Sequence, residues 1–453
     1  MSHALFAPHA LLPTGWATDV LLRWDDAGTL TDVTPQATAP AVTAVAAGPL
    51  VPGLPNLHSH AFQRAFAGLS EHRGAADDSF WTWRDLMYRF ALSVSPDQLE
   101  DIATQLYIEM LQAGYTAVCE FHYLHHDPAG RRYANPAEMS WRLVNAARRA
   151  GIGLTLLPVL YQDAGFGGQA PRADQRRFLN SVDGLLEIAE RTAATGTRVG
   201  VAPHSLRAVG PAALRELIAG IESTAPIHVH IAEQQQEVQD CLAWSGQRPV
   251  QWLLANAPVD ARWCLVHATH MTADERDALA ASGAVAGLCP STEANLGDGF
   301  FDASAYLAAG GAWGIGSDSH ASVGSGEELR LLEYTQRLTQ QRRNVLAGSA
   351  HAQVADRLWL SAVRGGAQAS GRRVAGLALG QQADFVVLDT RSTLAELAPA
   401  QALASHVFAP HGRNAVRDVW VAGHHHVRDG EHSAAHLACE RFVAARSALL
   451  SEV

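Results

Sequence analysis

Eight short apolar segments alternate with helix-like stretches between about residue 50 and residue 320. The segments are GPLVPGLPNLHSH, TAVCEFHYL, IGLTLLPVLY, RVGVAPHSL, IHVHIAE, RWCLVHAT, AVAGLCPST and AWGIGSDSH. Continuous apolar runs of this length are typical of buried parallel strands, and amphipathic stretches such as PDQLEDIATQLYIEMLQAG are typical of helices that cover them. The alternation predicts an α/β fold whose strands close into a (β/α)8 TIM-like barrel.

The two ends of the chain predict a smaller unit beside the barrel. DVLLRW and TLTDV flank a DDAG turn, while GQQADFVVLD and RDVWVAGHHHVRDG predict further strands after the barrel has ended. We expect residues 1–50 and 373–433 to form one small β-sandwich domain, residues 51–372 to form the barrel and residues 434–453 to form a C-terminal helix. The connection over residues 61–95 is expected to be a lid or a pair of helices packed on the barrel.

Composition argues against several classes of protein. The chain has 453 residues, 48% of them hydrophobic, so it can bury a large core. Its formal net charge of -11 opposes binding to nucleic acid or to an anionic membrane surface. No apolar run approaches the roughly 20 residues of a membrane span, and the five cysteines form no CxxC pair. We therefore expect a cytoplasmic protein without a cysteine metal site.

Residues of the types that bind metals stand at the ends of the expected strands. His58 and His60 end the first strand, His230 the fifth, His267 the sixth and Asp318 the eighth. Catalytic groups of a (β/α)8 barrel lie at the C-terminal ends of its strands, so these residues can meet at one mouth. Histidines together with a carboxylate suit Zn2+. The ordered set therefore predicts a metal-dependent hydrolase.

Glu233 lies three residues after His230 and is a candidate proton shuttle beside this metal. Taken alone, it would be interpreted as a surface glutamate that stabilises a helix N-terminus. His267 and Asp318 are candidates for activating the water whose pKa the metal lowers, and Glu233 would then protonate the departing nitrogen. His270 in the same VHATH run is the alternative to His267, which is favoured because it lies nearer the strand end.

Several segments resemble the amidohydrolase superfamily and, within it, the formimidoylglutamate deiminases of bacterial histidine degradation. The similar segments span residues 50 to 345 and are PGLPNLHSHAFQRAFAGL, FWTWRDLMYRF, CEFHYLHH, APHSLRAV, HVHIAEQ, WCLVHATH, CPSTEANLGDG and GIGSDSH. The resemblance implies hydrolysis of N-formimino-L-glutamate to N-formyl-L-glutamate and ammonia. It also implies a single Zn2+ in each subunit and a homodimer.

The resemblance also implies roles for individual residues. The implied metal ligands are His58, His60, His230 and Asp318, and the implied acid/base pair is Glu233 with His267. The implied substrate contacts are Gln63, Arg84, Tyr123, His204 and Arg207. Guanidinium groups suit the two carboxylates of such a substrate. A surface ion pair of Arg84 with Asp85 or Glu71, and a loop-stabilising contact of Arg207, stay open as alternatives.

The absence of lysine narrows the class of metal site. All 34 basic residues are arginine. Two-metal relatives such as dihydroorotases and ureases share the HxH motif but bridge their metals with a carboxylated lysine, which this chain lacks. A mononuclear site follows.

Two other functions stay open. One is a deaminase of guanine, a nucleoside or another amidine or guanidine, because side chains rather than the fold choose the substrate. The other is a non-catalytic barrel that serves as a scaffold, although such a barrel would be expected to lack some of the ligands. The run His424-His425-His426 lies outside the barrel and is expected to be plain surface or a weak adventitious metal site.

Overall fold

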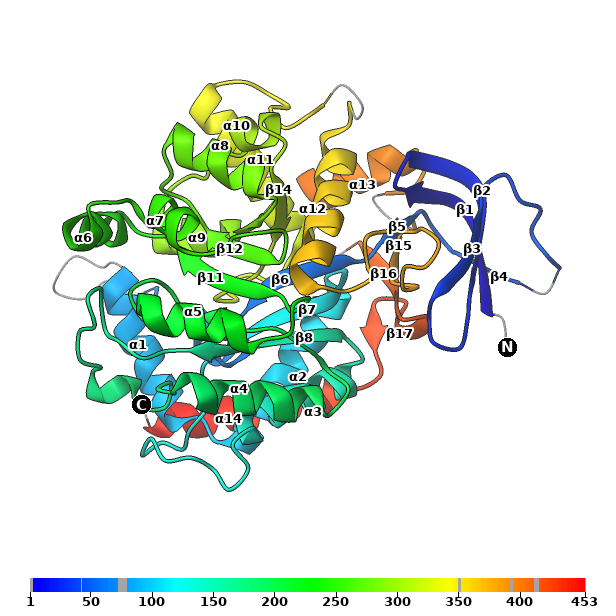
Figure 1. Cartoon of the computed structure of the whole chain (residues 1–453). Coiled ribbons are helices and arrows are strands. Elements are labelled where there is room, and N and C mark those ends of the chain that lie inside the picture. The colour runs from blue at the N-terminus through cyan, green and yellow to red at the C-terminus, as the bar shows by residue number, and fades with distance from the viewer. Residues whose placement is uncertain are drawn as a thin grey trace.

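Parallel strands occupy the middle of the molecule, and helices cover them from outside (Figure 1). The computed structural model describes residues 3–41, 43–71, 80–348, 352–391, 394–410 and 415–452. The central strands are β6 (Leu54–Ser59), β7 (Tyr115–His122), β8 (Gly153–Leu160), β9 (Arg198–Val199), β10 (Ala202–Pro203), β11 (Ile227–Ile231), β12 (Trp263–His267), β13 (Val285–Leu288) and β14 (Ala312–Ile315). Each of the eight apolar segments contains a central strand, and β9 and β10 share the fourth segment.

The central strands form two parallel sheets that meet at both of their edges. One sheet has the order β10-β8-β7-β6, with β9 beside β8, and the other has the order β11-β12-β13-β14. Isolated parallel bridges link Ser59 to Asp318 at one junction and Val201 to Ile227 at the other. The strands therefore follow one another around a circle, and their carboxyl ends lie at the same mouth.

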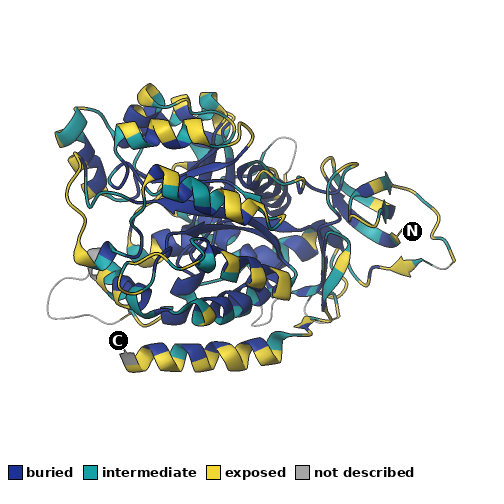
Figure 2. Cartoon of the chain, turned by 60° about the horizontal axis from the view of Figure 1, so that its bottom comes forward, coloured by how far each residue is buried: buried dark blue, intermediate teal, exposed yellow. Residues whose placement is uncertain are grey.

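The interior of this circle is closely packed. Every residue of β7 and β8 is buried, which explains why these segments are apolar without alternation. Leu57 of β6 is fully buried and packs against Val266 and Cys264 of β12. Gly314 of β14 makes room for Leu57, because a Cβ added there would lie 2.6 Å from Leu57 Cδ2. Figure 2 shows these central strands as the most buried part of the chain.

Some of the helices around the barrel begin at a residue whose side chain caps them. Around the barrel lie α2 (Pro96–Gln112), α3 (Glu138–Ala150), α4 (Val182–Ala193), α5 (Pro211–Gly220), α6 (Gln235–Ser245), α7 (Pro249–Asn256), α8 (Ala273–Ser282), α9 (Pro290–Leu296), α10 (Ala303–Ala308), α11 (Ser325–Gln340), α12 (Val354–Ser370) and α13 (Pro399–Phe408). Before α2, Ser95 accepts from the Gln98 backbone N–H at 3.2 Å, and Gln98 Oε1 accepts from the Ser95 N–H at 2.8 Å. No helix in the described ranges is both long and apolar enough to cross a membrane.

Both ends of the chain contribute to one small sheet. Its strands are β1 (His3–Leu12), β2 (Gly15–Trp24), β3 (Leu30–Thr34), β4 (Ala44–Val45), β5 (Leu50–Pro52), β15 (Phe385–Leu388), β16 (Val416–Val421), β17 (His424–Arg428) and β18 (Glu431–His432). Leu22 and Phe385, from opposite ends of the chain, pack in one apolar core. The sequence suggested a sandwich of two sheets, whereas these strands form one hydrogen-bonded path because β5 pairs with both β1 and β15.

The first apolar segment is divided between the two units. Its first part, β5, belongs to the small sheet, and its second part, β6, belongs to the barrel. Gly53 separates them and donates its N–H to the carbonyl of Asp384 at 3.0 Å. A Cβ at this position would lie 2.2 Å from the Thr116 side chain, so the close approach requires glycine.

Two segments cover the mouth and one helix lies along the outside. The connection after β6 forms a 3-10 helix, η1 (Ala61–Phe66), and the helix α1 (Phe80–Ser93), while residues 72–79 lie outside the described ranges. The Phe66 ring lies 5.2 Å from that of Phe90 and 6.0 Å from that of Trp83, in agreement with the expected helical packing. The C-terminal helix α14 (Ala435–Glu452) runs along the surface with alternating buried and exposed residues (Figure 2).

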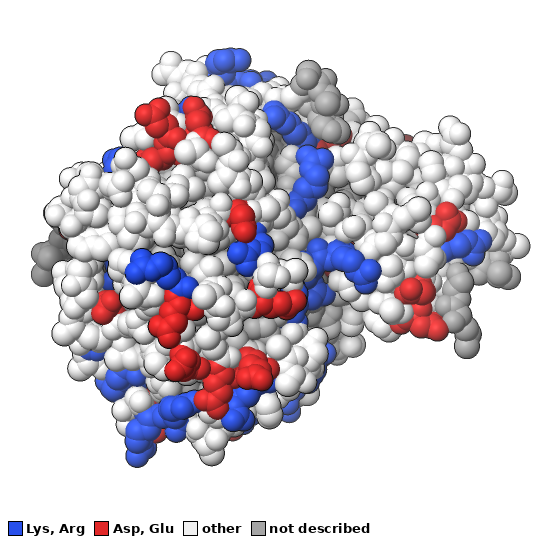
Figure 3. Space-filling model, viewed as in Figure 1, with Lys and Arg blue, Asp and Glu red and all other residues white. Residues whose placement is uncertain are grey.

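Charged side chains of both signs are mixed on the surface. On the face shown in Figure 3, arginines stand among aspartates and glutamates rather than in one basic patch. Glu187 of α4 illustrates this mixture, since it pairs with Arg132 and with Arg191. A nucleic-acid-binding surface concentrates positive charge, and this face does not.

Candidate functional site

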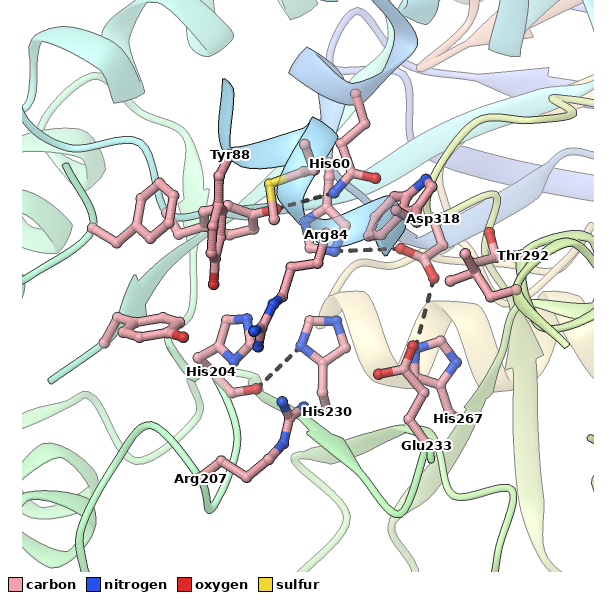
Figure 4. A pocket seen from close by; sticks show the side chains of 17 residues that line it. His60, Arg84, Tyr88, His204, Arg207, His230, Glu233, His267, Thr292 and Asp318 are labelled. Atoms are coloured by element: carbon pink, nitrogen blue, oxygen red, sulfur yellow. Dashed lines mark hydrogen bonds and ion pairs between the residues drawn. The ribbon is translucent and has the colours of Figure 1, made fainter. Parts of the chain in front are cut away.

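Three histidine nitrogens converge at the mouth of the barrel, and an aspartate oxygen lies beside two of them. Figure 4 shows His60, His230 and Asp318 of this group. His58 Nε2 lies 3.1 Å from His60 Nε2 and 2.9 Å from His230 Nε2. Asp318 Oδ1 lies 3.3 Å from His60 Nε2 and 3.6 Å from His58 Nε2. Residues separated by 260 positions in the sequence thus meet because the first, fifth and eighth strands end at one rim.

Backbone carbonyls orient two of these imidazoles. His60 Nδ1 lies 2.9 Å from the carbonyl oxygen of Phe121, and His230 Nδ1 lies 3.1 Å from that of His204. A carbonyl only accepts, so Nδ1 carries the proton and the Nε2 lone pair faces the common centre. Burial lowers the pKa of His60 to about 3 and that of His230 well below its usual value, so both rings are neutral. Neutral imidazoles whose lone pairs face one another beside a carboxylate fit a divalent cation.

His267 lies between this centre and two glutamates. Its Nε2 is 3.6 Å from Glu233 Oε1 and 3.6 Å from Asp318 Oδ2, and its Nδ1 is 3.2 Å from Glu293 Oε1. Burial alone would lower the pKa of His267, but the surrounding carboxylates, Glu233 foremost, raise it to about 10. Burial raises the pKa of Asp318 to about 7, although His267 opposes that shift. These groups are therefore placed to exchange protons at the mouth.

Glu293 is a part of the site that the sequence reasoning missed. It lies on α9, is buried, and also accepts the backbone N–H of Cys289 through Oε1 at 2.9 Å. Because Glu293 Oε1 accepts from His267 Nδ1, it directs His267 Nε2 toward Glu233 and Asp318. The segment CPSTEANLGDG contained this residue, but no spacing in the sequence related it to His267.

The strand ends that carry these groups have unusual backbone conformations. His267 has a φ of +68°, the next residue Ala268 has +49° and Asp318 has +45°. Side-chain-bearing residues rarely adopt this left-handed region, and they do so chiefly where surrounding contacts enforce it. Here the Asp318 N–H donates to the His58 carbonyl at 3.0 Å, and the Ala268 N–H donates to the Ile231 carbonyl at 3.0 Å. These unfavourable backbone conformations direct the side chains of His267 and Asp318 toward the mouth of the barrel.

Buried polar residues join the first strand to the eighth beneath the site. Asn56 Oδ1 accepts from the backbone N–H of His58 at 3.3 Å and of Ser317 at 3.2 Å, while its Nδ2 donates to Ser317 Oγ at 2.6 Å. Ser59, between the two histidines, donates to Glu120 Oε2 at 2.6 Å. Burial raises the pKa of Glu120 to about 7, although its hydrogen-bond donors oppose this shift. The network holds the two strand ends in register.

The residues expected to contact substrate line one cavity together with the converging groups. Its lining includes Gln63, Arg84, Tyr123, His204 and Arg207, along with His60, His230, Glu233, His267 and Asp318. Gln63 Nε2 donates to Tyr123 Oη at 3.0 Å, so these two are held together. Of all the residues proposed from the sequence, only His58 lies behind the lining, where it contacts His60 and His230. The structure therefore gathers the whole set at one place.

The two arginines reach the cavity from different elements. Arg84 comes from α1 and lies with Cζ 5.5 Å from the Tyr88 ring centre. Of the two acidic residues considered from the sequence, Asp85 lies 3.4 Å from Arg172 and Glu71 accepts from Asn295. In Figure 4 Arg84 and Arg207 extend toward each other beside His204.

Arg207 also has an acidic neighbour that the sequence did not reveal. Its Nε lies 3.9 Å from Glu237 Oε2 on α6, and Glu237 Oε2 accepts the backbone N–H of Glu233 at 3.2 Å. The loop-stabilising contact considered for Arg207 therefore exists beside its place in the cavity wall. Glu237 connects the arginine with the turn that carries Glu233.

The remaining histidine candidates lie apart from this centre. His270 Nδ1 lies 2.8 Å from Gln235 Nε2, and the residue does not line the cavity. The run His424–His426 is on β17, where the His425 ring stacks on Trp420 at 3.7 Å. Among the described residues, the groups placed to hold a metal ion include none of these histidines.

Comparison with known proteins places the chain among enzymes with this architecture. The amidohydrolase family model matches residues 50–425. A formimidoylglutamate deiminase from Pseudomonas aeruginosa is 52% identical over 451 residues, covering 99% of both chains. The crystal structure of an amidohydrolase from Brucella melitensis has a TM-score of 0.94 and 47% identity, covering 99% of this chain and 100% of that one. An adenosine deaminase from Xanthomonas campestris, solved with bound zinc, shares the fold with a TM-score of 0.80 at 22% identity, covering 99% and 98%.

Proposed function

Because this chain belongs to the amidohydrolase family, we propose that it hydrolyses N-formimino-L-glutamate to N-formyl-L-glutamate and ammonia. The observation that carries the proposal is a cavity with two arginines beside a centre of three histidines and one aspartate. The relative from Pseudomonas aeruginosa, similar over the full length, is named for this activity. In its host the reaction would belong to histidine degradation.

The charges of the cavity match those of the substrate. N-formimino-L-glutamate has two carboxylates and one amidine-like group, which is cationic when protonated. Arg84 and Arg207 offer planar pairs of N–H donors that suit carboxylates. Glu233 and Asp318 offer negative charge to the formimino group on the other side of the cavity. Gln63, Tyr123 and His204 add polar groups to the wall of the same cavity.

The donor set suits one Zn2+ per subunit. His58, His60, His230 and Asp318 would hold it, because the three histidine nitrogens lie together and Asp318 Oδ1 lies 3.3 Å from His60 Nε2. When bound, such a cation lowers the pKa of water and supplies the nucleophile at neutral pH. No lysine is present to bridge a second ion in the manner of two-metal relatives.

Side chains of the protein would carry out the proton transfers of the reaction. Asp318 would accept the proton that the attacking water loses as its oxygen bonds to the formimino carbon. His267, whose Nε2 lies 3.6 Å from both carboxylates, would pass a proton to Glu233 and regain one from Asp318. Glu233 delivers a proton to the nitrogen that departs, and the carbon–nitrogen bond breaks to release ammonia. The water oxygen stays with the carbon, so the product is the N-formyl compound. Arg84 and Arg207 hold the carboxylates throughout.

An alternative substrate is a purine or nucleoside, because the cavity wall also contains aromatic rings that could stack on a base, namely Tyr88, Tyr123, Tyr161 and Phe178. Two arginines in one wall favour an acidic substrate over a neutral base.

We further propose that the enzyme is a cytoplasmic homodimer that needs neither nucleic acid nor membrane.

The test is ammonia release by zinc-loaded protein from N-formimino-L-glutamate, with guanine, adenosine and N-formiminoglycine in parallel. Selective turnover of the glutamate compound is expected. Turnover of a purine instead would reject the proposed substrate but leave the proposed hydrolytic centre intact. No ammonia release from any compound by metal-replete protein would favour a non-catalytic barrel.

A further inference from the structure

A buried glutamine joins two tyrosines in the wall of the cavity. Gln175 ends the short 3-10 helix η2 (Ala173–Gln175), and its Nε2 donates to Tyr161 Oη at 2.8 Å and to Tyr88 Oη at 3.2 Å. Its Oε1 accepts the backbone N–H of Arg172 at 2.8 Å. Because a backbone N–H can only donate, the amide oxygen must face Arg172 and the amide nitrogen must face the tyrosines. The orientation of the Gln175 side chain is therefore determined by its contacts.

This orientation decides where the phenol hydrogens point. Gln175 donates to both phenol oxygens, so neither hydrogen can be directed at the amide. The two hydroxyls also bond to each other, which uses one of the two hydrogens. Burial raises the pKa of Tyr161, so its hydroxyl stays protonated. Within the described residues, the hydrogen bonds of Gln175, Tyr88 and Tyr161 provide no acceptor for the second phenol hydrogen. It is available to a ligand that accepts hydrogen bonds.

The tyrosines stand beside both arginines of the cavity. Tyr88 and Tyr161 line the same cavity as Arg84 and Arg207, and both arginines act on the pKa of Tyr161 through their charge. Two guanidiniums lie near the Tyr88 ring, with Arg84 Cζ at 5.5 Å and Arg172 Cζ at 5.6 Å from its centre. Figure 4 shows Tyr88 and Arg84 at the side of the cavity away from Asp318 and His267. Donors and positive charge thus gather away from the hydrolytic centre.

We propose that Gln175 sets the pair Tyr88 and Tyr161 to donate one hydroxyl hydrogen to the substrate's side-chain carboxylate, beside Arg84 and Arg207. This inference rests on the proposed function and specifies how that substrate is selected. The side-chain carboxylate is the one farther from the formimino group, so a site distant from the hydrolytic centre suits it. Gln175 acts through the tyrosines and is a positioning residue, whereas the tyrosine with the free hydroxyl hydrogen contacts the substrate.

Exchanging the amide for a carboxylate reverses the polarity of this group. In Gln175→Glu, the side chain accepts from the phenols, so the free hydroxyl hydrogen turns away from the cavity and a negative charge enters beside the carboxylate site. Gln175→Met has a similar length without any donor, and Tyr161→Phe removes a single oxygen. Tyr334→Phe is the matched control, because Tyr334 lies on α11, stacks on Phe408 and does not line the cavity.

The experiment measures binding of N-formyl-L-glutamate to zinc-loaded protein by titration calorimetry, and kcat/KM for N-formimino-L-glutamate and N-formiminoglycine. A hydrogen bond to a charged group contributes enough to change affinity roughly 10- to 100-fold. We expect Tyr161→Phe and Gln175→Met to weaken N-formyl-L-glutamate binding by about that factor, and Gln175→Glu to weaken it further. The loss in kcat/KM should arise mainly in KM and spare N-formiminoglycine, which lacks the side-chain carboxylate. Tyr334→Phe should match wild type.

Two results would overturn the inference. Unchanged binding in Tyr161→Phe and Gln175→Glu would remove the donor role, and equal losses for both substrates would show a general effect on the cavity. Thermal melting of each variant identifies those that fail to fold, and Tyr161→Phe remains the least disruptive change. If wild-type protein does not hydrolyse N-formimino-L-glutamate, the proposed function fails, and calorimetry with N-formyl-L-glutamate still decides the donor site independently.

Discussion

Replacing Glu233 by glutamine tests the proton transfer on which the proposed reaction depends. Glu233 is 5% exposed, and its Oε1 lies 3.6 Å from His267 Nε2. Its backbone N–H bonds to Glu237, so Glu233→Gln should leave the turn in place. Glutamine has the same shape but cannot deliver a proton at neutral pH. General acid–base catalysis contributes about 10²–10⁴-fold, so kcat should fall by that factor, which corresponds to about 2.7–5.5 kcal/mol in the barrier.

The assay is steady-state ammonia release, with the zinc content of each preparation measured by elemental analysis. Because the proposed ligands are His58, His60, His230 and Asp318 and not Glu233, the variant should keep its full zinc content. Glu216→Gln is the matched control, since Glu216 is exposed on α5. A kcat within a few-fold of wild type at full zinc occupancy would refute the assignment of Glu233 as the proton donor.

Three further outcomes are expected. Chelation should lower the melting temperature in calorimetry, because a ligand at 100 times its Kd adds about 2.7 kcal/mol of stability, and His58→Ala should abolish the difference. Arg207→Ala should reduce kcat/KM about 10- to 100-fold, mainly through KM, and unchanged steady-state kinetics would exclude this contact. Burial raises the pKa of Glu328 to about 8 from a usual 4.5, so the folded state holds a proton that the unfolded state releases between these values. The corresponding stability is present below pH 4.5 and is lost as the pH rises toward 8. Glu328→Gln should therefore lose less stability than wild type over this interval in urea denaturation, and parallel curves would contradict the assignment.

The barrel could be predicted because the burial of a strand restricts which residues that strand can contain. A strand buried on both faces must be apolar throughout, so each of the eight segments was recognisable without knowledge of its neighbours. The metal-type residues were recognisable for a related reason, since they directly follow those segments and barrel strands end at one mouth. Arg84 and Arg207 came from the family resemblance, and the structure brings both into the cavity.

The residues that the sequence reasoning missed share a different property. Gln175, Glu237 and Glu293 act through side-chain contacts with residues distant along the chain or on other elements. Polar residues in loops and on short helices follow no periodicity, so their partners depend on the path of the whole chain. The joining of both chain ends into one small β unit was predicted, but the pairing of β5 with both β1 and β15 was not, because strand pairing of this kind is non-local.

The sequence by itself determined the strand-and-helix alternation, the identity of the metal-type residues and the absence of a bridging lysine. Tertiary structure decided the direction in which each group points. The lone pairs of His60 and His230 face one centre because carbonyls of Phe121 and His204 take their other ring hydrogens. Hydrogen bonds and left-handed backbone conformations of this kind exist only after distant strand ends have been brought together, which is why no local pattern encodes them.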